Sequence, residues 1–331
     1  MIRDLVTRSE QAATDRPGEE AWTLPIRPRR RIGYWLVALV TCLCIALLIA
    51  SLATNKAMQW GVVGTYLFNS QILHGATITC ELTVFSMILA ELIAVPIALF
   101  RLSGNAFLRV VGYLYVWMFR SIPLLVLLIV WFNIGLFYPR IGFGIPYGPV
   151  FVSASTKQLV TALDAAVAAL GLNEAAYSSE ILRTSIRAVA AGQRDAAKAL
   201  GMRSTVMFRR IILPQAVKIA IPPLGNDTIG MVKSTALVAF IAVPDLLYSS
   251  QTIYESNYEV VPLLIVASIW YIVIVTVLTI IQSLLERWMD RSMRSAARPN
   301  VAKLAAGSLH SREAFGAWRT VPGLGESETD T

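Results

Sequence analysis

The chain has 331 residues, of which 56% are hydrophobic and only 15% are charged, and its mean hydropathy is +0.60. Soluble domains are nearer a quarter charged, so this composition argues against an ordinary soluble enzyme, a disordered chain or a collagen-like repeat, and it indicates an integral membrane protein. Because the net charge is +8, the positions of the 29 Lys and Arg residues are the next observation to make.

Six segments are long and apolar enough to be membrane spans. A spanning helix needs about 20 mostly apolar residues. The segments that satisfy this requirement are 33–53, 74–100, 110–137, 159–182, 220–247 and 260–285, and the inner four contain ionisable residues. We therefore expect an all-α membrane protein with about six transmembrane helices.

The positive charges alternate between the segments that join these spans. Twenty-four Lys and Arg residues lie in 1–33, 101–109, 183–218 and 287–331, and three lie in the other connections. Since cytoplasmic segments retain Lys and Arg, this pattern predicts that both termini are cytoplasmic. The basic pI of about 9.6 then reflects membrane orientation, and it predicts no nucleic-acid partner.

The two ends of the chain are predicted to be tails. Residues 1–32 are polar and contain a basic cluster, which we interpret as a cytoplasmic anchor for the first span, in preference to a cleaved signal peptide or a twin-arginine signal. Residues 291–331 are rich in Ala, Gly and Ser after Arg298, and we expect a disordered cytoplasmic tail there.

The long basic loop between the fourth and fifth spans, 188–218, is predicted to fold as helix, break, helix. Strong helix formers follow Gln193, and Gly201 ends that run as a C-terminal glycine commonly does. Asp195 is expected in the first helical turn, where a negative charge is favourable. The alanines make this helix thin, and a thin basic helix suits a groove on a soluble partner.

At this loop the sequence resembles the EAA signature of ABC importer permeases, EAA-x3-G-x9-I-x-L-P. All seven defined positions are present at the family's spacing, with Asp in place of Glu at the first: Asp195, Ala196, Ala197, Gly201, Ile211, Leu213 and Pro214. A motif of this length is highly specific.

Further segments resemble the polar amino acid (histidine/glutamine-type) permeases, and the likeness covers residues 70–290. They are Phe119–Leu125, Glu174–Ile181, Pro222–Asp227 and Lys233–Leu237. The resemblance implies a type I importer permease of the bacterial inner membrane, with a first transmembrane helix at 33–53 outside the shared domain. The largest departure is Ser121-Ile122, where the family has Gly-Thr.

The resemblance also implies partners. The EAA helix would dock on an ABC ATPase subunit, and ATP and Mg would be used by that subunit, with no cofactor bound by this chain. An extracytoplasmic solute-binding protein would deliver cargo to the connections 54–72, 138–158 and 248–259. A second permease chain, identical or paired, and membrane lipid would complete the assembly.

Several ionisable or polar residues inside the predicted spans are candidates for the substrate pathway. Intramembrane charges are costly, so they pair or line a polar cavity. A zwitterionic amino acid needs a group of each sign, and the candidates are Glu81, Arg120, Glu180, Asn226 and Lys233. For each charged residue the alternative is a structural ion pair, and for Glu180 the candidate partners are Arg183 and Arg187.

No catalytic or metal site is predicted. A P-loop needs G-x4-G-K-[ST], but Met231 and Val232 separate Gly230 from Lys233. The two histidines, His74 and His310, form no ligand set. The leading prediction is the permease subunit of an ATP-driven importer for polar amino acids. The alternatives are import of an opine, an osmolyte or another small zwitterion, and a non-ABC membrane enzyme or channel.

Overall fold

The computed structural model of the chain describes residues 32–144 and 150–297, which divide into two units between Met58 and Gln59. The first unit contains α2 (Ile32–Thr54) and a short 3-10 helix, η2 (Lys56–Met58). The side chains of α2 are exposed from Gly33 onward, as lipid-facing side chains would be, and the helix matches the first predicted span. The predicted tail before Ile32, including the cluster Arg27, Arg29, Arg30 and Arg31, lies outside the described residues.

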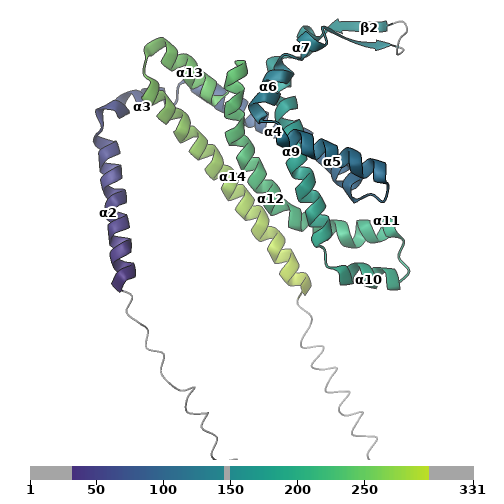
Figure 1. Ribbon diagram of the computed structural model, residues 1–331. Helices are drawn as coiled ribbons and strands as arrows, with labels where there is room; N and C mark the ends of the chain where they lie inside the picture. The colour runs from purple at the N-terminus through teal and green to yellow at the C-terminus, as the bar shows by residue number, and fades with distance from the viewer. Residues whose placement is uncertain (1–31, 145–149, 298–331) are drawn as a thin grey trace, which may run out of the picture. The chain divides into compact units, whose positions relative to one another are not determined.

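The second unit is mainly helical, and its elements are shown in Figure 1. In chain order they are α3 (Trp60–Tyr66), α4 (Ser70–Leu102), α5 (Ala106–Ser121), α6 (Leu124–Phe132), α7 (Ile134–Phe137), β1 (Arg140–Gly144), β2 (Val150–Ser155), α8 (Thr156–Leu159), α9 (Ala162–Ala188), α10 (Ala191–Ala199), α11 (Ser204–Met207), the π-helix η3 (Phe208–Ile212), α12 (Leu213–Ser234), the 3-10 helix η4 (Thr235–Ile241), α13 (Leu246–Asn257) and α14 (Val260–Ala297).

Three helices in the described part of the chain are long and apolar enough to cross a membrane, namely 33–54, 70–102 and 260–289. Two bent pairs of helices raise this number to five if each pair is one span. The helix α9, which covers the fourth predicted span, is less apolar because Asp164, Glu174 and Glu180 interrupt it. The structure thus agrees with several membrane helices, and the count of six stays a prediction.

The third predicted span, 110–137, is not one straight helix. It divides into α5 and α6, whose axes are bent by 98° at Ile122 and Pro123. Ile122 has φ −89° and ψ 127°, the extended backbone that a following proline favours. The sequence predicts a single span over 110–137, whereas the structure breaks it at Pro123.

A small antiparallel sheet adds to the mainly helical fold that the sequence predicts. β1 and β2 pair with Arg140 opposite Ser155 and Ile141 opposite Ala154. The strands are rich in β-branched and aromatic residues and are separated by a Gly- and Pro-containing segment, which is a hairpin pattern. The rest of the described fold is helical.

Close packing of α4 against α9 forms the centre of the second unit. The α9 face is built from small buried residues, including Ala165, Ala166, Ala169 and Ala176. A Cβ on Gly171 would lie 2.9 Å from Leu89 Cδ2, so this position has no room for a side chain. Small residues allow membrane helices to approach closely, and that approach brings the polar groups of α4 and α9 together.

At the C-terminal end, α14 continues to Ala297 and therefore extends into the predicted tail 291–331. The remainder of that tail lies outside the described residues. The positions that the sequence assigns to the last span, 260–285, are all helical.

Candidate functional site

The basic loop after α9 folds as predicted, into two short helices. Figure 1 shows α10 and α11 lying side by side beneath α5, at the end where α9 stops. The helix α10 begins at Ala191, so Asp195 lies in its second turn and not in the first turn as expected. The carboxylate of Asp195 lies 4.0 Å from the Lys198 amine, and both side chains are exposed.

Gly201 ends α10 with a left-handed backbone, φ +68°. The Met202 N–H donates to the Ala197 carbonyl at 3.1 Å, and the Gly201 N–H donates to the Lys198 carbonyl at 2.9 Å. This pair of hydrogen bonds is the Schellman arrangement, in which glycine is favoured because it has no Cβ. The glycine predicted from the motif therefore turns the chain out of α10.

The motif residues divide into exposed and structural positions. Asp195 and Ala196 are exposed, and next to them Leu200 presents a side chain that is 81% exposed. Ala197 is buried against the rest of the loop. A large apolar side chain at the tip of a polar loop is a feature of binding surfaces, so the exposed face of α10 is a candidate docking surface.

The second half of the motif joins the loop to α12. Ile211 lies in the π-helix η3, and Leu213 and Pro214 begin α12. Proline is tolerated in the first turn of a helix because it lacks an N–H at a position where none is needed. A small apolar cluster of Val189, Ile212 and Ala216 lies under the loop. This cluster fixes the loop to the ends of α9 and α12.

Two of the predicted pathway residues, Arg120 and Glu180, line one cavity of about 270 Å³. The Glu180 carboxylate forms ion pairs with Arg101 and Arg183. Arg183 is one of the two partners that the sequence suggested for a structural ion pair. Arg120 is exposed, and its guanidinium lies 4.7 Å from the centre of the Tyr177 ring. Such a stacked cation retains its hydrogen-bond donors.

The other three predicted pathway residues lie apart from this cavity. Glu81 on α4 and Lys233 on α12 are exposed. Asn226 is also exposed, and its side-chain oxygen accepts a hydrogen bond from Gln282 of α14 at 3.3 Å. The five candidates therefore do not form a single site in the described part of the chain.

A cluster of three carboxyl groups, which we call the acidic cluster, was missed by the sequence analysis. It consists of Glu91 on α4, Glu174 on α9 and Asp227 on α12. The carboxyl groups of Glu174 and Asp227 are close enough to interact electrostatically, and Glu91 is close enough to interact with both. Three like charges would repel one another strongly in a low-dielectric interior.

The acidic cluster has unused hydrogen-bonding capacity. One oxygen each of Glu91 and Glu174 is buried without a hydrogen-bond partner among the described residues. The buried Ser178 hydroxyl lies one helical turn after Glu174 and beside the Glu91 carboxyl. It forms no well-aligned hydrogen bond with any described residue. No Lys or Arg of the described residues forms an ion pair with these carboxylates. Buried polar groups are usually satisfied, so this arrangement is suited to binding a cation.

Beside the acidic cluster lies an open groove of about 810 Å³ between α4, α12 and α14. Glu91 and Thr228 are polar groups in a lining that is otherwise apolar, and Leu92, Leu224 and Leu285 contribute to its walls. Sequence spacing alone indicated that Glu91, Glu174 and Asp227 lie inside spans. Only the packing of three helices brings them together.

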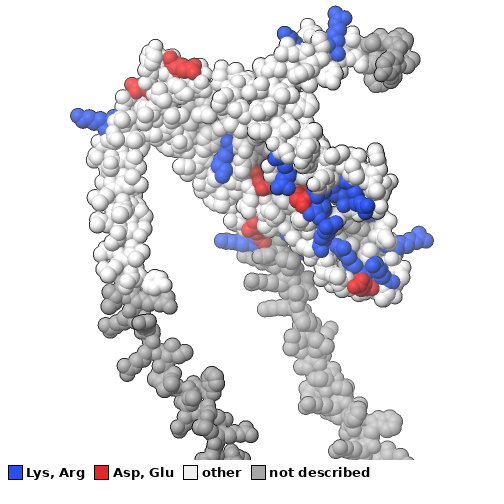
Figure 2. Space-filling model, in the orientation of Figure 1, with Lys and Arg blue, Asp and Glu red and all other residues white. Residues whose placement is uncertain are grey.

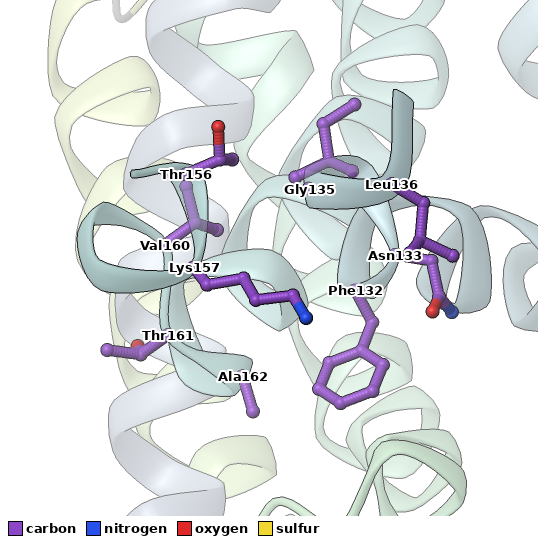
Figure 3. A pocket seen from close by; sticks show the side chains of 10 residues that line it. Phe132, Asn133, Gly135, Leu136, Thr156, Lys157, Val160, Thr161 and Ala162 are labelled. Carbon is purple, nitrogen blue, oxygen red and sulfur yellow. The ribbon is translucent and has the colours of Figure 1, made fainter. Parts of the chain in front are cut away.

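A second cavity, of about 400 Å³, lies at the opposite end of the unit from α10 (Figures 1 and 3). It is formed where α6 and α7 meet α8. The helix α8 contains the last residues of the predicted receiving connection, 138–158. Figure 3 shows the Lys157 side chain extending across it toward Phe132. The cavity and the β1–β2 hairpin are therefore candidates for contact with a delivering protein.

The chain has clear relatives among known proteins. Residues 84–291 match the family described as "Binding-protein-dependent transport system inner membrane component". The arginine transport system permease protein ArgU of Corynebacterium glutamicum is 40% identical over 84% of this chain and 87% of its own length. The histidine/lysine/arginine/ornithine permease HisM of Salmonella typhimurium is 35% identical over 65% of this chain and 89% of its own length.

A solved structure supports the same assignment. An amino acid ABC transporter determined with histidines aligns with a TM-score of 0.57 and 31% identity, over 68% of this chain and 96% of that one. This similarity is consistent with the features described above, namely the EAA loop, the apolar helices and the core of small residues. The chain belongs to the family of inner membrane components of binding-protein-dependent transport systems, and it is a type I permease subunit of an amino acid ABC importer.

Proposed function

We propose that the cargo of this permease is a cationic amino acid of the arginine type. The observation that carries the proposal is the acidic cluster, because three neighbouring carboxyl groups within the helical core favour a positively charged ligand. The names of two relatives, an arginine permease and a histidine/lysine/arginine/ornithine permease, support the same class of cargo.

The groove beside the acidic cluster could hold the hydrocarbon part of the cargo's side chain. A cationic amino acid carries its charge on a hydrocarbon stem, which needs an apolar surface beside an acidic one. The groove offers that combination, because its walls are apolar and Glu91 lies in its lining. The predicted residues Glu81, Asn226 and Lys233 remain candidates for contacts elsewhere along the pathway, including contacts to the cargo's α-carboxylate.

The proposed assembly contains three further components. The exposed face of α10, with Asp195, Ala196 and Leu200, would dock in a cleft on an ABC ATPase, and that subunit would use ATP and Mg²⁺. A solute-binding protein would contact the opposite end, near the β1–β2 hairpin. A second permease chain would complete the membrane pathway. Each chain would have about six spans, with both termini in the cytoplasm.

The cargo proposal is tested by removing one charge from the acidic cluster. The complex is reconstituted in proteoliposomes, and uptake of labelled arginine is measured for Glu174→Gln. Glu286→Gln is the matched control, because Glu286 lies on α14, outside the acidic cluster and the predicted receiving connections, and its carboxylate accepts a hydrogen bond from Gln282 at 2.9 Å.

We expect Glu174→Gln to lower arginine uptake at limiting cargo by about 10-fold to 100-fold, because a hydrogen bond to a charged group is worth about 1.5–3 kcal/mol. Glu286→Gln should leave uptake at the wild-type level. Wild-type arginine uptake by the Glu174→Gln complex would disprove a role for the acidic cluster in cargo recognition.

A further inference from the structure

We propose that the cavity around Arg120, between α4, α5 and α9, binds the phosphate group of an anionic phospholipid. This cavity, called here the Arg120 cavity, has a volume of about 270 Å³. Its lining includes Arg101 and Glu180 together with Tyr113, Trp117 and Arg120 of α5. The inference goes beyond the proposed function, because it assigns Arg120 to a lipid and not to the cargo.

The charges in the Arg120 cavity leave one cation available. The Glu180 carboxylate is shared between Arg101 and Arg183, which together carry more positive charge than it can neutralise. Arg120 has no carboxylate partner among the described residues, and its recorded interaction is with the face of the Tyr177 ring. A guanidinium offers several donors in one plane, which matches the oxygen atoms of a phosphate group.

The outer wall of the Arg120 cavity is apolar and faces away from the protein core. Tyr113 and Trp117 are each 60% exposed. The apolar side chains of Phe107, Val110 and Leu114 on the same helix are also exposed. This surface would accommodate the acyl chains attached to a phosphate, which a free phosphate ion lacks.

The depth of the Arg120 cavity agrees with a lipid headgroup. Arg101 lies in the last turn of α4, one of the three long apolar helices, and so marks the membrane boundary. Tyr and Trp side chains are enriched at that boundary. Figure 2 shows Lys and Arg gathered at the end of the unit formed by α5, α10 and α11. If α10 faces the cytoplasm, as the proposed function requires, the lipid belongs to the cytoplasmic leaflet, where negative surface charge attracts basic residues.

The test compares lipid retention by two variants that each lose one positive charge from α5. The purified permease–ATPase complex, without cargo or ATP, is titrated with phosphatidylglycerol or phosphatidylcholine, and bound lipid is counted by native mass spectrometry. Arg120→Gln removes the proposed ligand. Arg109→Gln is the matched control, because Arg109 is exposed on the same helix and does not line the Arg120 cavity.

We expect wild type and Arg109→Gln to retain phosphatidylglycerol in preference to phosphatidylcholine, and Arg120→Gln to bind it about fivefold more weakly. Arg120→Lys, which retains the charge, should retain part of the preference and so exclude a folding defect. Because no transport is measured, failure of the cargo proposal would not affect this result.

Three outcomes would overturn the inference. In the first, Arg120→Gln and Arg109→Gln retain phosphatidylglycerol equally. In the second, millimolar inorganic phosphate displaces the lipid, so that the site holds a free anion. In the third, cysteines introduced at Trp117 of two permease chains cross-link in the complex, so that the second chain and not lipid covers this surface.

Discussion

Gly201 shows how one residue can shape the surface that we propose docks on the ATPase. Its left-handed backbone allows the two hydrogen bonds that end α10, and a Cβ at this position would meet no atom within 4 Å. The need for glycine is thus a requirement of the backbone and not of space within the chain. A substitution there should disturb the end of the helix without disturbing the membrane core.

We predict that Gly201→Val weakens the local structure by about 1–2 kcal/mol, the cost of a left-handed backbone for a residue with a Cβ. The binding-protein-stimulated ATP hydrolysis of the reconstituted complex should fall several-fold. Gly104→Ala is the matched control, because Gly104 lies in the short connection between α4 and α5, outside the docking surface, and a Cβ there would meet nothing within 4 Å. Equal ATP hydrolysis by Gly201→Val and wild type would contradict this role.

The packing of α4 against α9 determines where the polar groups of the core lie. Gly171 and the alanines of α9 let the two helices approach, and α12 packs on α9 next to them. Glu91, Glu174 and Asp227 meet because three helices cross at one place. The sequence identified each of these residues as an intramembrane acid, but periodicity within one helix contains no information about which helices become neighbours.

We predict that Gly171→Leu destabilises the α4–α9 pair, because its Cβ alone would lie 2.9 Å from Leu89 Cδ2 and overpacking typically costs about 1–3 kcal/mol. Thermal unfolding of the purified protein in detergent should shift down by several degrees. Gly64→Leu in α3 provides the control, since a Cβ there meets nothing within 4 Å. A Gly171→Leu midpoint equal to that of the control would show that the helices are less tightly packed than described.

Other elements show why part of the fold could be predicted and part could not. The apolar segments predicted α2 and α4 nearly to their ends and the start of α14, because a membrane span is marked by composition alone. The EAA spacing predicted α10 and its terminal glycine. The 98° bend between α5 and α6 and the β1–β2 hairpin depend on local backbone geometry, which composition does not encode.

At the scale of the whole molecule, the described features follow one order from one end of the second unit to the other. The basic loop that contains α10 and α11 lies at one end of the second unit, the β1–β2 hairpin lies at the other, and the acidic cluster lies in the helices that join them (Figure 1). An importer needs this order, because cargo arrives at one face and ATP is used at the other. The family assignment agrees with it, and the cargo is the central new claim.

That claim is tested most directly by cargo competition in proteoliposomes that contain this permease, its ATPase and its binding protein. ATP-dependent uptake of labelled arginine is measured with unlabelled arginine, lysine, glutamine or leucine in excess. The account predicts that uptake requires internal ATP and that arginine and lysine compete strongly while glutamine and leucine do not. ATP-dependent uptake of glutamine with no uptake of arginine would contradict it.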